Sequence, residues 1–341
     1  MIAVHLAMET LSDRSVLSAV EMVKSAGPVA DINLFSVMKD EGYFLPAFFD
    51  HYRKLGVQHF FVLDDRSTDG TADYLSDQPD CTLLKCGFTY GQRVKIRGRF
   101  RFWKNRETRI GVELKRLLPR RFCEGKWCIY ADADEFLLLP VQFSGLAEFL
   151  CEMDARGHSL AVSSMTVFYP ERLRDIEGGG LERPRSLDDL IAVAPFLEGL
   201  PTIQFDQESR IRRAGVTVDQ RLLQKHGLVG PGERGWGGSH KVSIFRPGRS
   251  VYLTGSHNAS KNPSPDFLNC VAHFKYTPDL IRRIQLAIET RAWAFQSSKY
   301  VLLAKLLEKM RKGDDSFVGE KSRRYLNRGQ LESFGLMKFK A

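Results

Sequence analysis

Hydrophobic residues along the chain form short continuous runs, separated by stretches in which they recur at helical spacing. The continuous runs predict buried strands at Ile32–Met38, Val57–Leu63, Trp127–Tyr130 and Leu160–Phe168. Between the first two runs, apolar residues recur every three or four positions from Phe44 to Leu55, and Gly56 follows where such a helix would end. Strands that alternate with helices favour an α/β fold with a mostly parallel, Rossmann-like central sheet flanked by helices.

The two ends of the chain carry separate helix signals. Ser12 is a suitable N-cap for a helix over residues 13–25, so residues 1–30 are predicted to be an N-terminal helical extension. Thr277-Pro278 is a good helix start, and apolar residues follow it at helical spacing. We therefore expect an α/β domain over residues 31–280 and a basic, helical C-terminal region over residues 281–341.

The charge of the chain is concentrated in two segments. The 341 residues include 50 Lys and Arg against 41 Asp and Glu, for a formal net charge of +9. Twelve basic and two acidic residues lie in residues 93–121, and eleven basic and five acidic ones in residues 299–341, which leaves the rest of the chain acidic. Basic segments attract polyanions such as nucleic acid, acidic lipid or a sugar nucleotide. The first segment is predicted to be helical over residues 103–118, ended by Pro119, with most of its charges on a solvated face.

The cysteine pattern and the length of the apolar runs bear on the compartment. Six cysteines without a CxxC pair are typical of reduced thiols in a cytoplasmic protein. The longest uncharged run, Phe136–Ala147, has 12 residues, whereas a membrane-spanning helix needs about 20. Glu9 interrupts the short apolar start of the chain, so no signal peptide is expected. The expectation is a cytoplasmic protein whose basic segments can contact the anionic inner face of a membrane peripherally.

Two acidic clusters directly follow predicted strands. Asp132, Asp134 and Glu135 come after the third predicted strand, and Asp64-Asp65 after the second. Ligands of parallel sheets bind at the carboxyl ends of the strands, so this placement is the first functional signal. Carboxylates two residues apart can converge on a hard divalent cation together with phosphate oxygens of a substrate. The alternative is a solvated turn, which the strongly apolar flanks disfavour for the Asp132 cluster and which accounts equally well for the Asp64 cluster.

Through these two clusters, the chain resembles the GT-A glycosyltransferases of the family-2-like group. The stretch Tyr130–Phe136 resembles that group's metal-binding DxD motif in its DxDEF form. Residues 35–41 and 63–71 resemble its nucleotide-binding half, although the usual Lys-Asn-Glu is Lys39-Asp40-Glu41 here, which leaves the role of Asp40 open. The resemblance covers roughly residues 31–280 and is loose between residues 170 and 240. Its acceptor-half landmarks correspond to Phe205-Asp206, Lys241, His257 and His273-Phe274-Lys275.

The resemblance implies a metal-dependent transfer from a UDP- or GDP-sugar, with inversion, to a hydroxyl of a glycan or lipid-linked acceptor in bacterial surface polysaccharide or glycolipid synthesis. It implies that Glu41, Asp64 and Asp65 hold the nucleoside, and that Asp132 and Lys275 serve the donor diphosphate. The metal, Mn²⁺ or Mg²⁺, would be bound by Asp132, Asp134 and His273. His257 is an alternative ligand, and His273 is as readily explained as a core residue of an apolar strand.

An inverting transferase also needs a carboxylate base that deprotonates the acceptor hydroxyl. Asp206, which follows a short apolar run, is the first candidate. Glu233 is the second, within the glycine-rich stretch of residues 230–238, which is predicted to be a loop like the glycines at 178–180. Both are also explained as ordinary surface acids.

Other interpretations stay open. Phosphatases that form an aspartyl-phosphate use Asp-x-Asp after a strand, but early in the chain and followed by Thr or Val, whereas Glu135-Phe136 follow here at mid-chain. A nucleic-acid- or anionic-lipid-binding protein with an inactive transferase-like domain would explain the basic segments and leave the acidic clusters unexplained. No recognised nucleic-acid-binding module accompanies the basic segments, so nucleic acid is not expected as a partner.

Overall fold

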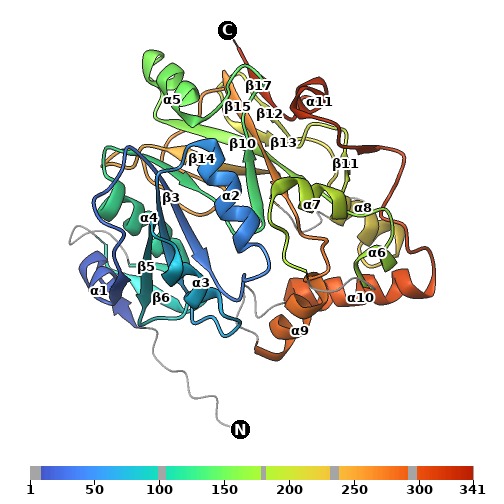
Figure 1. Ribbon diagram of the computed structural model, residues 1–341, viewed down its shortest axis with the longest axis horizontal. Coiled ribbons are helices and arrows are strands. Elements are labelled where there is room, and N and C mark those ends of the chain that lie inside the picture. The colour runs from blue at the N-terminus through green and yellow to red at the C-terminus, as the bar shows by residue number, and fades with distance from the viewer. Residues whose placement is uncertain (1–8, 99–104, 178–181, 231–237, 291–297, 341) are drawn as a thin grey trace.

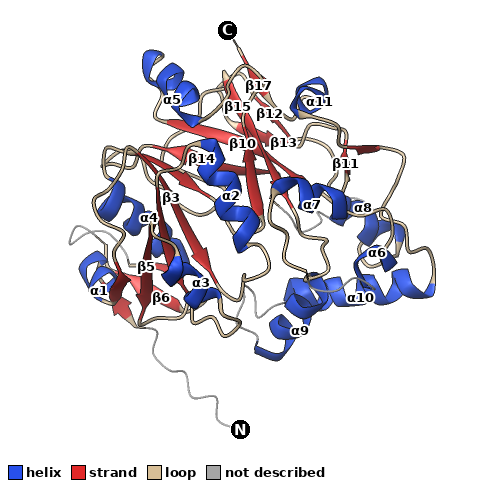
Figure 2. Ribbon diagram, in the orientation of Figure 1, coloured by secondary structure: helices blue, strands red, loops and turns tan. Residues whose placement is uncertain are grey.

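The computed structural model describes residues 9–98, 105–177, 182–230, 238–290 and 298–340 (Figure 1). A large mixed sheet crosses the molecule in the strand order β17-β15-β10-β14-β8-β3-β4-β5-β2, and β9 pairs with β15 beside this path. Helices surround the sheet (Figure 2), and two large apolar cores form between them and its faces. The chain therefore has the mixed α/β architecture that its hydrophobic pattern predicts.

One half of this sheet is parallel. In spatial order, β8 (Trp127–Tyr130), β3 (Ile32–Met38), β4 (His59–Asp64) and β5 (Cys81–Cys86) are parallel neighbours. Beyond β8 the direction reverses, because β14 (His240–Phe245) is antiparallel both to β8 and to β10 (Leu160–Val167). Parallel pairing is thus continuous in this half and, among the described strands of this sheet, recurs only between β10 and β15 (Phe267–His273), so the predicted mostly parallel sheet is in fact mixed. A strand's own apolar pattern does not encode its direction relative to a distant neighbour.

The central strands bury both of their faces. Along β4, Phe60 and Val62 join the core under α2 (Leu45–Leu55), while Phe61 and Leu63 join the core under α4 (Ile110–Cys123). Successive side chains of a strand point to opposite faces, so a strand covered on both sides needs a continuous apolar run rather than an alternating one. Ligands of such sheets bind at the carboxyl ends of the strands.

The N-terminal extension is part helix and part strand. The helix α1 covers Asp13–Ser18 and begins at the predicted cap, where the Ser12 hydroxyl accepts a hydrogen bond from the backbone N–H of Ser15. It ends seven residues earlier than predicted, and Val20–Lys24 forms β2, which pairs antiparallel with β5. Pairing with an open sheet edge satisfies the backbone of this segment, which a local helix signal cannot anticipate.

The basic segment also differs from its predicted helix. Arg93–Ile96 (β6) and Arg106–Arg109 (β7) form an antiparallel pair, and residues 99–104 lie outside the described part of the chain. The helix α4 begins at Ile110 and continues through Pro119 to Cys123. An internal proline costs about 3 kcal/mol, and the burial of several α4 leucines against the sheet offsets that cost.

The other elements are short, apart from two helices near the C-terminus. The strands are β1 (Thr10–Leu11), β9 (Glu135–Leu138), β11 (Phe196–Glu198), β12 (Ile203–Phe205), β13 (Ile211–Arg213), β15 (Phe267–His273), β16 (Ser322–Arg324) and β17 (Lys338–Phe339). The helices are α3 (Thr71–Asp77), α5 (Leu146–Ala155), α6 (Arg174–Glu177), α7 (Leu187–Val193), α8 (Val218–Lys225), α9 (Leu280–Thr290), α10 (Ser298–Lys312) and α11 (Arg328–Ser333). None of the described helices has the length and apolarity that a bilayer span requires.

The helices α9 and α10 lie side by side at the lower edge of the view in Figure 1. Their apolar residues, among them Leu280 and Ile284, form a separate core together with residues of α6 and α8. At the other end of the C-terminal region, β17 pairs with β15 and extends the main sheet. Between these ends, β16 pairs with β11, so the C-terminal region is packed against the sheet domain at several places.

One buried tyrosine of α2 supports the turn that carries the acidic cluster. The Tyr52 hydroxyl donates to the carbonyl of Glu135 at 2.9 Å and accepts from the backbone N–H of Leu137 at 3.2 Å. Tyr52 has no exposed surface. Removal of this hydroxyl would leave two buried backbone groups without a partner at the start of β9.

We expect Tyr52→Phe to lower the free energy of unfolding by about 1–3 kcal/mol, the usual effect of unpaired buried polar groups. Urea unfolding measures this change. Tyr74→Phe removes the same hydroxyl from α3, away from this turn, and should change stability by less than about 0.5 kcal/mol. Equal effects of the two substitutions would contradict the role assigned to Tyr52.

Candidate active site

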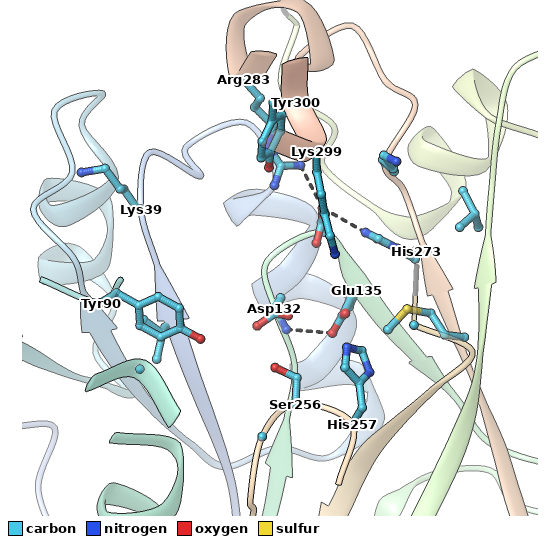
Figure 3. Close-up of a pocket in the computed structure, with 18 of the residues that line it drawn as sticks. Lys39, Tyr90, Asp132, Glu135, Ser256, His257, His273, Arg283, Lys299 and Tyr300 are labelled. Carbon is cyan, nitrogen blue, oxygen red and sulfur yellow. Dashed lines mark hydrogen bonds and ion pairs between the residues drawn. The ribbon is translucent and has the colours of Figure 1, made fainter. Parts of the chain in front are cut away.

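A cavity of about 680 Å³ opens at the carboxyl ends of β3, β4 and β8 (Figure 3). Its lining brings together both predicted acidic clusters, through Asp65 of one and Asp132, Asp134 and Glu135 of the other, and adds Glu41. Residues of α4, α8, α9 and α10 and of the loop 254–258 complete the wall. The volume lies within the range of small-molecule sites, and its position is the one expected for a ligand of an open α/β sheet.

Asp132 and Glu135 share a buried lysine. Lys241, on β14, is fully buried, and its Nζ lies 2.6 Å from Asp132 Oδ2 and 2.5 Å from Glu135 Oε2. Burial by itself would raise the pKa of Asp132, but Lys241 and Lys115 lower it below its ordinary value. Burial dominates at Glu135 and keeps its pKa above the ordinary value in spite of Lys241. The side chain of Asp132 is 37% exposed and that of Glu135 only 4%. Of these two carboxylates, Asp132 is therefore the one that a ligand can reach.

Asp134 is engaged by two other basic side chains. Its Oδ2 lies 2.8 Å from Arg283 Nη1 and 3.3 Å from His273 Nε2. The same guanidinium reaches Glu41 Oε1 at 3.2 Å and so joins the loop after β3 to the turn after β8. Burial raises the pKa of Glu41 to about 8, with Arg283 opposing and Asp134 adding to the shift. In Figure 3, Arg283 and His273 lie on different sides of the cavity.

The predicted metal ligands do not match this arrangement. Oxygen atoms that bind Mn²⁺ or Mg²⁺ need a free lone pair directed at the ion. Asp134 Oδ2 is already within hydrogen-bond distance of Arg283, and Asp132 Oδ2 of Lys241. Within the described residues, no group of three or more His, Cys, Asp and Glu side chains is placed to hold a metal ion. The residues as arranged do not fit a divalent cation, and metal binding stays a prediction.

Basic and aromatic side chains line the remainder of the cavity. Lys115, 5% exposed, places its Nζ 2.5 Å from the Ser256 hydroxyl and 4.7 Å from the ring centre of Tyr130. Lys275 lies 2.5 Å from Asp219, and Lys299 enters from α10. Figure 3 shows Lys299 directed into the cavity, with Tyr90 across from it. Among the described basic residues of segment 93–121, only Arg109 and Lys115 line the cavity.

The residues predicted for the nucleoside take different positions. Glu41 and Asp65 line the cavity, whereas Asp64 is absent from the lining. Asp64 is 2% exposed and accepts a hydrogen bond from the backbone N–H of Ser67, which stabilises the turn after β4. Asp40, whose role the sequence left open, has a positive φ of 54° and accepts the N–H of Thr68. It therefore ties the loop after β3 to the loop after β4.

The candidate bases lie apart from this cavity or outside the described residues. Asp206 follows β12, is absent from the lining, and accepts hydrogen bonds from Arg210 and Arg212. Hydrogen bonds from the backbone and side chain of Arg210 hold the pKa of Asp206 well below its usual range. Glu233 belongs to residues 231–237, which are outside the description, as are residues 178–181. His257 lines the cavity, and burial lowers its pKa to about 4, so its ring is neutral at pH 7.

Arg283, Lys299 and Asp219 are site residues that sequence reasoning missed. In the sequence, Arg283 lies among the apolar positions of the helix predicted after Thr277-Pro278. Its spacing from Leu280 and Ala287, three and four residues, places it on the buried face of α9, and a charged residue on such a face is a signal that could have been noticed. Lys299 and Asp219 carry no comparable signal, since only the packing of α10 and α8 brings them to the cavity.

We expect Lys241→Met to lower the free energy of unfolding by about 3–5 kcal/mol at neutral pH, because it removes the cation shared by the buried Glu135 and the partly exposed Asp132. Their pKa values in the folded variant then exceed those in the unfolded chain. Carboxyl groups with a raised pKa make the folded variant less stable as pH rises. In the natural chain the pKa of Asp132 is lowered instead, so this group makes the folded state more stable as pH rises. The stability difference should therefore widen between about pH 5 and pH 7.

Urea unfolding of both chains across this pH range checks the expectation. Lys126→Met is a matched control, because Lys126 is 48% exposed and pairs with Asp31 on the surface. A surface pair contributes about 0–1 kcal/mol. A stability difference for Lys241→Met that stays constant with pH would contradict the buried-pair explanation.

Comparison with known proteins adds no argument about the function of this chain. No protein-family model matches the chain, and no curated protein matches it. Among solved structures, the chain is similar to residues 1–349 of TarS from S. aureus, a wall teichoic acid glycosyltransferase, at 12% sequence identity and a TM-score of 0.31. The match covers 84% of this chain and 73% of the TarS chain. A likeness at this TM-score carries no argument about activity, so the functional proposal rests on the cavity itself.

Proposed function

We propose that the protein is a glycosyltransferase that uses a nucleotide-sugar donor, bound in the cavity at the carboxyl ends of β3, β4 and β8. The observation that carries the proposal is the pairing of an exposed carboxylate, Asp132, with basic side chains in one cavity. A nucleotide sugar needs both: carboxylates accept hydrogen bonds from ribose and sugar hydroxyls, and ammonium groups neutralise phosphate oxygens.

Different residues of the cavity would bind different parts of the donor. Glu41 and Asp65 lie beside the ends of β3 and β4 and would receive the nucleoside. Asp132 would accept from a hydroxyl group, and Lys275 and Lys115 would contact the diphosphate. Stabilising the diphosphate as it leaves is the main task of such a site, because negative charge develops there as the glycosidic bond breaks. A glycan or lipid-linked hydroxyl acceptor remains the proposal for the second substrate, and inversion is the proposed stereochemistry.

Asp206 is not carried into this proposal as the base, since its carboxylate is held by two arginines outside the cavity. Metal dependence is likewise left out, because the predicted ligands face protein cations.

A panel of UDP- and GDP-sugars tests the proposal, with the melting temperature of the protein as the first readout and donor hydrolysis as the second. We expect at least one donor to raise the melting temperature, and Asp132→Asn to weaken its binding about tenfold or more, as loss of a charge-assisted hydrogen bond does. Asp77→Asn makes the same substitution on the exposed surface of α3 and should bind the donor unchanged.

The panel is run both with Mn²⁺ and with EDTA, so that metal dependence does not decide the outcome. If no donor stabilises the protein in either condition, the proposed function is wrong. Donor binding that survives Asp132→Asn would show that the donor lies elsewhere.

A further inference from the structure

The starting observation is that Arg283 takes the position at Asp134 that a divalent cation would need. Its guanidinium joins Asp134 and Glu41, two carboxylates that approach the same part of the cavity from β8 and from β3. A divalent ion bound to Asp134 Oδ2 would lie beside this guanidinium, where two like charges repel each other at low dielectric. Metal and Arg283 are therefore competitors for one carboxylate.

Arg283 is held firmly in place. Its side chain is 12% exposed and lies over the ring of Phe44 at 5.6 Å. The adjacent Arg282 ties α9 down, donating to the carbonyl of Asp40 at 2.8 Å and to the Asp279 carboxylate at 2.6 Å. Displacing Arg283 would leave Asp134 and Glu41 buried without a counter-ion unless the metal replaced it fully.

The cavity also contains cations that no protein carboxylate fully balances. Lys115 is paired with a hydroxyl rather than a carboxylate, as described above. Lys299 makes no ion pair with any residue of the described chain. Partial burial, together with the nearby Lys275 and Arg109, lowers the pKa of Lys299, and the charge of Asp219 opposes this shift without cancelling it. Lys275, which pairs with Asp219 at 2.5 Å, adds a third ammonium group to the same lining. Three ammonium groups in one cavity favour a polyanionic group of a ligand.

We propose that the diphosphate of the donor is neutralised by Lys115, Lys275 and Lys299, while Arg283 holds Asp134, so that donor binding does not require a divalent cation. This inference rests on the proposed function and deepens it. The leaving diphosphate carries away the electron pair of the glycosidic bond, and the three ammonium groups offset the charge that a metal ion would otherwise offset. The C-terminal region then belongs to the donor site, because α9 supplies Arg283 and α10 supplies Lys299.

Titration calorimetry with UDP and GDP tests the proposal on the full chain. The dissociation constant of the nucleotide that binds should differ less than about twofold between EDTA and Mn²⁺. Binding lost in EDTA and restored by Mn²⁺ would overturn the proposal and leave the proposed function standing. Absence of binding in both conditions would overturn the proposed function as well.

A lysine variant identifies the contact. Lys299→Met should weaken binding of the same nucleotide about tenfold or more in EDTA, since one charge-assisted contact is lost. Lys305→Met removes an exposed lysine of the same helix, outside the cavity lining, and should leave the affinity unchanged. Equal affinities of Lys299→Met and the natural chain would exclude Lys299 from the diphosphate site.

Mn²⁺ alone, followed by its electron paramagnetic resonance spectrum, tests the competition at Asp134. The natural chain should not bind Mn²⁺, whereas Arg283→Met should gain a site that Asp134→Asn abolishes. Arg283→Lys preserves a positive charge for stability and should stay without bound Mn²⁺, and Arg311→Met, which removes a guanidinium of α10 paired with Glu177, serves as the control. Binding of Mn²⁺ by the natural chain that is lost in Asp134→Asn would overturn the assignment of Arg283.

Discussion

The site depends on the buried ion pairs that hold the Asp132–Glu135 turn. Four carboxylates after β3 and β8 would repel one another in a low-dielectric cavity if each faced the ligand alone. Lys241 and Arg283 prevent this, the first from β14 and the second from α9. Each pair also joins elements that are far apart in the chain, so the charge balance and the geometry of the cavity have the same cause.

The same pairs distinguish the two aspartates of the motif. Asp134 is enclosed between Arg283 and His273, with 9% of its side chain exposed, whereas Asp132 keeps 37%. The two positions look equivalent in the sequence, and for that reason both were predicted to bind the metal ion. Their environments separate them into a carboxylate that binds the protein and a carboxylate that can bind a ligand. In the proposed donor site, protein cations take the role of a metal ion in offsetting the charge of the donor.

Much of the parallel half of the fold could be predicted from the sequence, because a strand covered on both faces must be apolar throughout. Ile32–Met38 and Trp127–Tyr130 were predicted with the bounds that the structure has. The continuation of α4 through Pro119 and the strand β2 were not predicted, because both depend on packing or pairing with distant residues. The cavity position followed from the acidic residues at strand ends, whereas Asp206 was chosen from a local pattern that does not show where β12 lies.

By itself, the sequence determined the α/β pattern of the first half and the acidic residues at the ends of its strands. These features are local, and covalent spacing is enough to express them. Only the tertiary structure decided which charges meet. Lys241 lies 109 residues from Asp132 along the chain, and Arg283 lies 149 residues from Asp134. No local sequence pattern connects residues at such separations. Electrostatic interactions act through space at a few ångströms, so the partners of a buried carboxylate are set by the fold.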